Sequence, residues 1–114
     1  MKKFLIIYHA PIEAMKQMAE TTPEQQAKGL EEWKKWAQKC GDKLVDMGAP
    51  LMNGLEISPK GHTKNSHKNV AGYSIMQGEN LEEIKALLIG HPHIGGWNAD
   101  STIEVHETIP IHGM

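Results

Sequence analysis

The chain has 114 residues, of which 39% are hydrophobic and 23% charged, with a formal net charge of −2 at pH 7. This length suffices for one domain with its own core, and the slightly acidic balance gives no reason to expect nucleic acid or an anionic membrane as a partner. A single cysteine, Cys40, excludes a disulfide framework and favours a reducing, cytoplasmic environment. No apolar segment is long enough to span a bilayer. We therefore treat residues 1–114 as a single domain.

An apolar run from Phe4 to Tyr8 begins the pattern of secondary structure. The run is rich in strand-forming residues and ends at His9-Ala10-Pro11, so it predicts a central strand covered on both faces. A short helical pattern over residues 12–18 follows it.

A long helix is predicted over residues 22–47. Thr22 suits the N-cap position, and Gln25 stands where a capping box places Glu or Gln. We expect a kink at Gly41 and a helix end at Gly48. Apolar residues at helical spacing form one stripe for burial, namely Leu30, Trp33, Ala37, Cys40, Leu44 and Met47.

The remaining segments alternate between strand and helix patterns. They are a strand at 51–57, a polar and locally basic hairpin loop at 58–69, a strand at 70–77, a helix at 81–88 capped by Asn80, and a strand at 102–108. The order βαββαβ predicts an α+β fold, the ferredoxin-like sandwich, with an antiparallel sheet and both long helices on one face. The other face then needs a cover, most simply a second copy of the chain.

Four stretches of the sequence resemble the YCII-related (DGPF-like) domain proteins of the dimeric α/β-barrel group. They are KKFLIIYHAP, DKLVDMGAPL, VAGYSIMQGENLEEIKALLIGHPH and STIEVHETIPI, which together extend over nearly the whole chain. The resemblance implies a ferredoxin-like protomer and a homodimer in which two sheets pack face to face as a dimeric α/β barrel. It implies no established reaction.

The His–Asp pair that the resemblance suggests as catalytic in the YCII branch is absent here. The chain has no histidine between Ala10 and Gly61, and Leu51, Met52 and Asn53 follow the Ala-Pro where that branch has Asp. The activity of that branch is therefore not expected of this chain.

Glu104 and His106 are the first candidates for chemistry. Alternation along the last predicted strand puts both side chains on one side of it. If that side is the open face of the sheet, burial in a dimer would suit them, together with His9, to acid–base catalysis. If the strand is a solvated edge, they are ordinary polar residues.

His91 and His93 form the second candidate, in the sequence His-Pro-His. Together with His9, His106 and Glu104 they would provide enough ligands for a divalent transition metal. The alternative is that both imidazoles lie at the C-terminal end of the second helix, where positive charge is favourable. No cofactor other than such a metal is predicted.

Aromatic residues supply candidate walls for a pocket that binds a small molecule. Trp97, among glycines, Tyr73 and Trp36 are the candidate ligand-binding residues, whereas Trp33 is expected in the core and Trp36 partly exposed. No phosphate loop, dinucleotide fingerprint, zinc-finger spacing or serine-hydrolase elbow occurs. Two classes of function remain: a small enzyme that uses acid–base groups or a metal, and a non-catalytic ligand-binding or accessory module.

Overall fold

The computed structural model describes residues 1–113. In chain order the elements are β1 (Lys2–His9), α1 (Ile12–Ala19), α2 (Pro23–Cys40), the 3-10 helix η1 (Gly41–Lys43), β2 (Leu44–Pro50), β3 (Leu55–Ile57), β4 (Thr63–Asn65), β5 (Val70–Gly78), α3 (Leu81–Leu88), the 3-10 helix η2 (Pro92–Ile94) and β6 (Thr102–Glu107).

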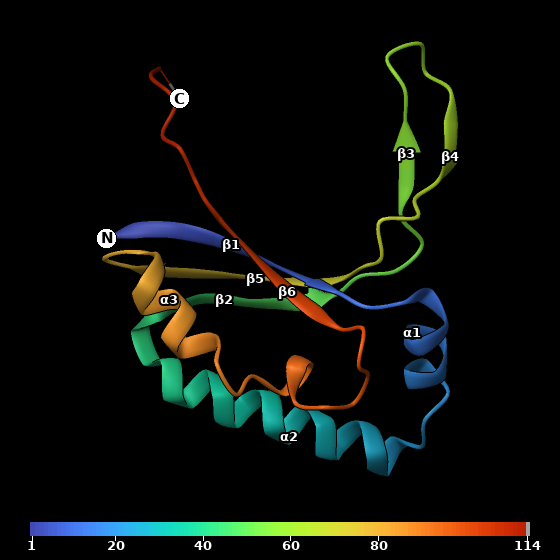
Figure 1. Ribbon diagram of the computed structural model, residues 1–114, viewed down its shortest axis with the longest axis horizontal. Helices are drawn as coiled ribbons and strands as arrows, with labels where there is room; N and C mark the ends of the chain where they lie inside the picture. Colours follow the sequence, from blue (N-terminus) through green and yellow to red (C-terminus); the bar gives the residue numbers. More distant parts are fainter. Residues whose placement is uncertain (114) are drawn as a thin grey trace.

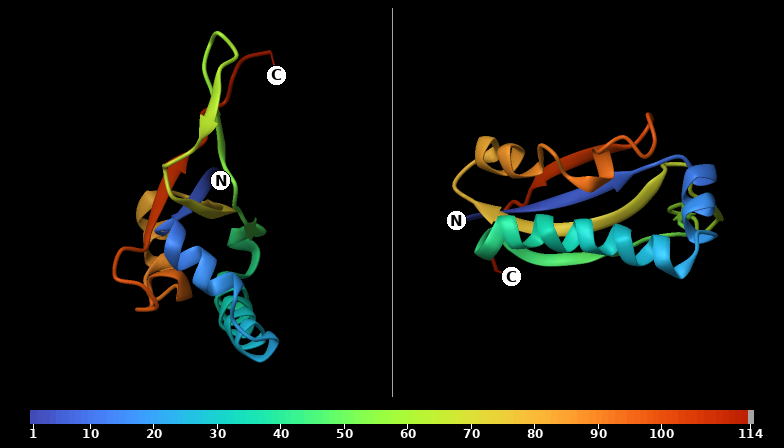
Figure 2. Two further views of the ribbon diagram at one scale, coloured as in Figure 1. Left: turned by 90° about the vertical axis from the view of Figure 1, so that its right-hand side faces the viewer. Right: turned by 90° about the horizontal axis from the view of Figure 1, so that it is seen from below.

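Four of the strands form one antiparallel sheet in the order β2-β5-β1-β6. Helices α2 and α3 cover the same face of this sheet, and α1 stands at one end of it (Figures 1 and 2). This confirms the predicted ferredoxin-like α+β fold and the central position of the first strand. No helix within residues 1–113 combines the length and the apolar character needed to cross a membrane.

The core lies between the sheet and the two helices. Phe4, Ile6 and Tyr8 of β1 point into it and are fully buried, together with Met76 of β5 and Ile84 of α3. The intervening residues of β1 point to the opposite face, as strand geometry requires. The structure leaves this second face uncovered, which we call the open face.

The predicted start of the long helix is confirmed, but its predicted end is wrong. Thr22 and Gln25 form a reciprocal capping box. The helix stops at Cys40 because Gly41 adopts a positive φ of 57°, which favours glycine. Gly41 is therefore the cap and not an internal kink.

Residues 44–50 are strand β2, so Leu44 and Met47 do not extend the helical stripe. The expected stop at Gly48 is a bulge in this strand. Its φ of 75° and the carbonyl of Tyr73, which would lie 1.8 Å from an added Cβ, leave room for glycine alone. At the other end of the stripe Leu30 is exposed, because only the C-terminal half of α2 packs on the sheet.

The strand predicted at 51–57 is confirmed only over Leu55–Ile57, and the predicted loop at 58–69 contains the strand β4. β3 pairs with β4 in a separate two-stranded hairpin. We call residues 53–69 the arm. In Figure 1 the arm and the C-terminal segment after β6 both rise from the side of the sheet opposite to α2 and α3. The Cα radius of gyration is accordingly 15.6 Å, against about 13 Å for a compact chain of roughly this length.

Cys40 should react with a thiol reagent at least ~100-fold more slowly in the native protein than after denaturation. The side chain is 4% exposed and packs in the core, and burial raises the pKa of its thiol, so the reactive thiolate is scarce and shielded. Time courses with a chromogenic disulfide, with and without denaturant, measure the two rates. Rapid labelling of the native protein would contradict the packing of α2 described here.

Candidate functional site

Three titratable side chains meet on the open face at the junction of β1 and β6. Glu104 lies opposite Ile7 in the ladder, and His9 lies two pairs further along, opposite Thr102. Nε2 of His9 is 2.8 Å from Oε1 of Glu104, and Nε2 of His106 is 3.5 Å from the same oxygen. The predicted placement of Glu104 and His106 on one side of the last strand is therefore correct, and His9 joins them. We call these three residues the acid–base cluster.

His9 is held between two acceptors. Its Nδ1–H donates to the carbonyl of Lys68 at the foot of the arm, at 2.9 Å, while Nε2 faces the carboxylate of Glu104. A carbonyl and a carboxylate both accept hydrogen bonds, so the geometry places both ring nitrogens of His9 against acceptors.

Glu104 is the centre of charge in the cluster. The hydrogen bond from His9 and the interaction with His106 hold the pKa of this carboxyl below its usual range, so it is ionised at neutral pH. More than half of the His106 side chain is exposed. With one ring nitrogen directed at Glu104, the other is available to a ligand.

An apolar surface adjoins the cluster on the open face. Leu5 is 37% exposed and Ile7 is half-buried, and across the ladder they meet Ile75 and Tyr73 of β5. Tyr73, a predicted ligand-binding residue, therefore lies on the same face as the acid–base cluster. Its neighbour Ser74 points into the core, where Oγ contacts the hydroxyl of Tyr8 and donates to the carbonyl of Met47.

His91 and His93 lie on the other side of β1 from the acid–base cluster. His91 is fully buried among the rings of Tyr8, Trp33 and Trp36, and its Nδ1 accepts the backbone N–H of His93. Its Nε2 has no hydrogen-bond partner among the residues that the structure describes. Because Nδ1 accepts, Nε2 carries the hydrogen, and the edge-to-face contacts with the two indoles suit an N–H···π interaction.

Burial also decides the charge of these two histidines. It lowers the pKa of His91 to about 3, and that of His93 below its usual value. The expectation that they act as imidazolium groups at the end of a helix is therefore wrong. His91 instead caps η2, and His93 donates Nε2–H to the carbonyl of His9 at 2.8 Å.

The five predicted metal ligands do not converge. His93 reaches the backbone of His9 and not its ring, and His91 is enclosed by aromatic rings. Within residues 1–113, no group of three or more His, Cys, Asp or Glu side chains is arranged to hold a metal ion.

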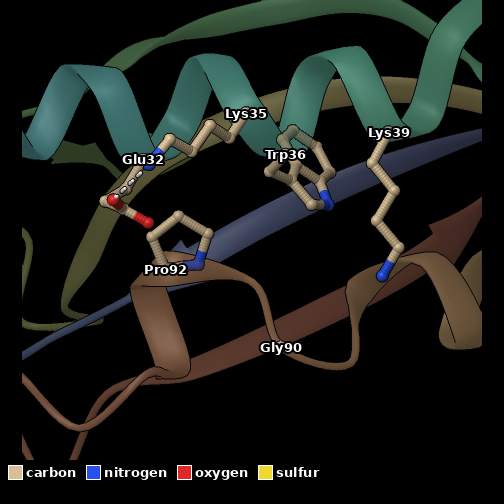
Figure 3. Close-up of a pocket in the computed structure, with 6 residues that line it drawn as sticks. All are labelled: Glu32, Lys35, Trp36, Lys39, Gly90 and Pro92. Carbon is tan, nitrogen blue, oxygen red and sulfur yellow. Dashed lines mark hydrogen bonds and ion pairs between the residues drawn. The ribbon is translucent and has the colours of Figure 1, made fainter.

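The tryptophans are placed differently from the prediction. Trp36 is buried and not partly exposed as expected, whereas Trp33 is partly buried and packs against the core. Trp36 donates Nε1–H to the carbonyl of Leu87. It also forms the floor of a shallow depression of about 200 Å³ between α2 and the chain before η2, with Glu32, Lys35, Lys39, Gly90 and Pro92 around it (Figure 3).

Trp97 lies in the connection between η2 and β6. Its Nε1–H donates to the carbonyl of His93. It lines a second depression, of about 210 Å³, against Ala14, Met18 and Thr21. Neither Trp36 nor Trp97 therefore lies beside the acid–base cluster.

Two contacts of His9 were not predicted from the sequence, those with Lys68 and His93. Both go through backbone carbonyls, so no motif of side chains could reveal them. The available signal was the pairing of the first and last strands, which brings His9 close to Glu104 once the fold is assumed.

Comparison with known proteins identifies a shared fold. A 5-chloro-2-hydroxyhydroquinone dehydrochlorinase (TftG) from Burkholderia phenoliruptrix AC1100, solved in complex with 2,5-dihydroxybenzoquinone, aligns with a TM-score of 0.51 and 16% identity over 90% of each chain. No family model matches the sequence. No curated protein matches it either. The similarity that this alignment shows is one of fold alone.

The stability of the protein should fall by about 2 kcal/mol between pH 7 and pH 5 through His91 alone. Its pKa moves from 6.5 to about 3 on folding, so below pH 6.5 the unfolded chain takes up a proton that the folded chain excludes. The contribution is present above pH 6.5 and is lost as the pH falls. Urea unfolding at both pH values should show a smaller loss for His91→Phe, which cannot titrate.

His67→Phe is the matched control, because His67 is exposed on the arm. It should retain the pH dependence of the wild type. An equal loss of stability in the wild type and in His91→Phe would contradict the assignment of a neutral, buried His91.

Proposed function

We propose that this protein is a small cytoplasmic enzyme of the YCII-related (DGPF-like) type. Residues 1–114 would form one domain, and two copies would pack with their open faces together. The acid–base cluster and the apolar surface beside it would then line a pocket for a small molecule. The reaction would be a proton transfer.

In this proposal each member of the cluster has its own role. His106 is the general base, since its outward nitrogen can reach a substrate while Glu104 orients the ring and stabilises the imidazolium that forms. His9, hydrogen-bonded to the carbonyl of Lys68 and to the carboxylate of Glu104, fixes the position of that carboxylate. The observation that carries the proposal is the carboxylate of Glu104 held between two imidazoles, beside apolar side chains of β1 and β5 on the same sheet face.

The dehydrochlorinase with the same fold supplies a first test substrate. Loss of HCl from a hydroxylated ring requires a base that removes a proton as chloride departs, which is chemistry that a Glu–His pair can perform. Leu5, Ile7 and Tyr73 offer a surface of suitable character for a small ring.

The protein should be a dimer in solution. The open face presents Leu5, Ile7, Ile75 and Tyr73 in one patch, and apolar patches of this kind mark interfaces. Light scattering at micromolar concentration should report twice the chain mass of 12.7 kDa. A stable monomer would remove the proposed pocket together with the assembly.

The wild type should bind 2,5-dihydroxybenzoquinone and release chloride from 5-chloro-2-hydroxyhydroquinone. Glu104→Gln and His106→Gln should each lower the rate of chloride release by roughly 100-fold or more, because each removes a member of the acid–base pair while preserving its shape. Binding of the quinone by calorimetry and chloride by electrode are the measurements. A repeat after treatment with a chelator shows whether a divalent transition metal takes part.

His62→Ala with His67→Ala, both on the arm and outside the cluster, is the control and should retain wild-type rates. Binding without turnover would indicate the alternative, a non-catalytic ligand-binding module. Equal rates in the wild type and Glu104→Gln would contradict the role of the cluster.

A further inference from the structure

The two chain segments that join the arm to the sheet each contain an asparagine with a positive φ. Among residues 1–113, the non-glycine residues with positive φ are Asn53 and Asn69, both at 59°. Asn53 lies in the leg that enters the arm, and Asn69 lies in the leg that returns from it. Asparagine tolerates this left-handed conformation better than most residues. The sequence is therefore suited to holding the arm away from the sheet, as Figure 1 shows.

The arm has an apolar side that is exposed in the described part of the chain, residues 1–113. Leu55 and Ile57 share one side of β3 and are 58% and 65% exposed. The other side carries Glu56, whose carboxylate is 3.2 Å from the ammonium of Lys64. β3 and β4 pair with each other, and neither makes an extensive contact with another described element. A lone two-stranded hairpin is marginally stable in water, so this side requires a partner.

The charge of the arm favours a second copy of this chain as that partner. The arm contains three lysines and one glutamate, whereas the whole chain has a formal net charge of −2. The rest of each molecule is therefore negatively charged and attracts the arm of another. Ile109 and Ile111, which are also exposed, rise with the C-terminal segment from the same side of the sheet as the arm. The arm and the C-terminal segment thus rise from the same side of the sheet as the open face, and all three carry exposed apolar side chains that a second copy can cover.

The foot of the arm is joined directly to the acid–base cluster. The carbonyl of Lys68 accepts Nδ1–H of His9, and the carbonyl of the adjacent Asn69 accepts the backbone N–H of Ala10. The first of these contacts orients the His9 ring so that Nε2 meets Glu104. A shift of the arm at Asn69 therefore moves an acceptor on which the cluster depends.

We propose that the arm docks through Leu55 and Ile57 on a second copy of the chain, and that docking holds in place the Lys68–His9 contact that the single chain already forms. The proposal rests on the homodimer proposed above and adds a second contact to it. It makes the arm an element of both the interface and the site.

The test replaces the apolar side of the arm by Leu55→Thr with Ile57→Thr, which retains strand-forming residues. The variant keeps the core intact, because neither residue belongs to it. The dimer dissociation constant, measured by sedimentation, should rise by at least ~10-fold, since each copy loses two aliphatic contacts. The nitrogen chemical shifts of the His9 imidazole, assigned with His9→Gln, should move away from those of the wild-type dimer.

Glu56→Gln with Lys64→Gln is the matched control on the opposite side of the arm, and it should change the dissociation constant by less than about threefold. An unchanged dimer in Leu55→Thr with Ile57→Thr overturns docking by the arm, while the proposed enzyme dimer stands. A weakened dimer with unchanged His9 shifts overturns the link to the site. A monomeric wild type overturns the proposed homodimer itself.

Discussion

The pairing of β1 with both of its neighbours is the constraint on which the two faces of this molecule depend. The ladders to β5 and β6 fix the direction of every side chain of β1. Tyr8 therefore points into the core, where it contacts Ser74, and the next residue, His9, points to the open face and meets Glu104. From beneath, His93 donates to the carbonyl of His9. The acid–base cluster thus joins a residue of the central strand β1 to two residues of the edge strand β6.

The sequence was sufficient for those elements whose signals are local. Asn80 caps α3 as predicted, and the alternation of β6 predicted that Glu104 and His106 share a side. The end of α2 was beyond such reasoning, because Gly41 and Gly48 both adopt positive φ. Gly41 ends a helix, whereas Gly48 lies at a bulge in a strand. Only the pairing of β2 with β5 distinguishes the two roles. Apolar residues continue at helical spacing through β2, so periodicity indicated Gly48, and not Gly41, as the end of the helix.

The histidines show why a candidate site is harder to predict than a fold. His91 and His93 form the most conspicuous motif in the sequence, yet packing of the connection before β6 beneath β1 encloses His91 in aromatic rings and keeps it neutral. His9 belongs to no motif and is held by a carbonyl from residue 68. The chemistry of an imidazole follows from its burial and its acceptors, and both are set by contacts between distant segments.

The acid–base cluster also shows what a cover over the open face must achieve. In the single chain the Glu104 side chain is about half exposed, so water and salt screen its interactions with both histidines. Excluding water would strengthen these interactions, but it would also remove the hydration of the charges, which is costly unless each has hydrogen-bond partners. Those partners are already in place, since His9 bonds to Lys68 and to the carboxylate. A cluster arranged in this way can tolerate burial, whereas an isolated Glu104 would take up a proton instead.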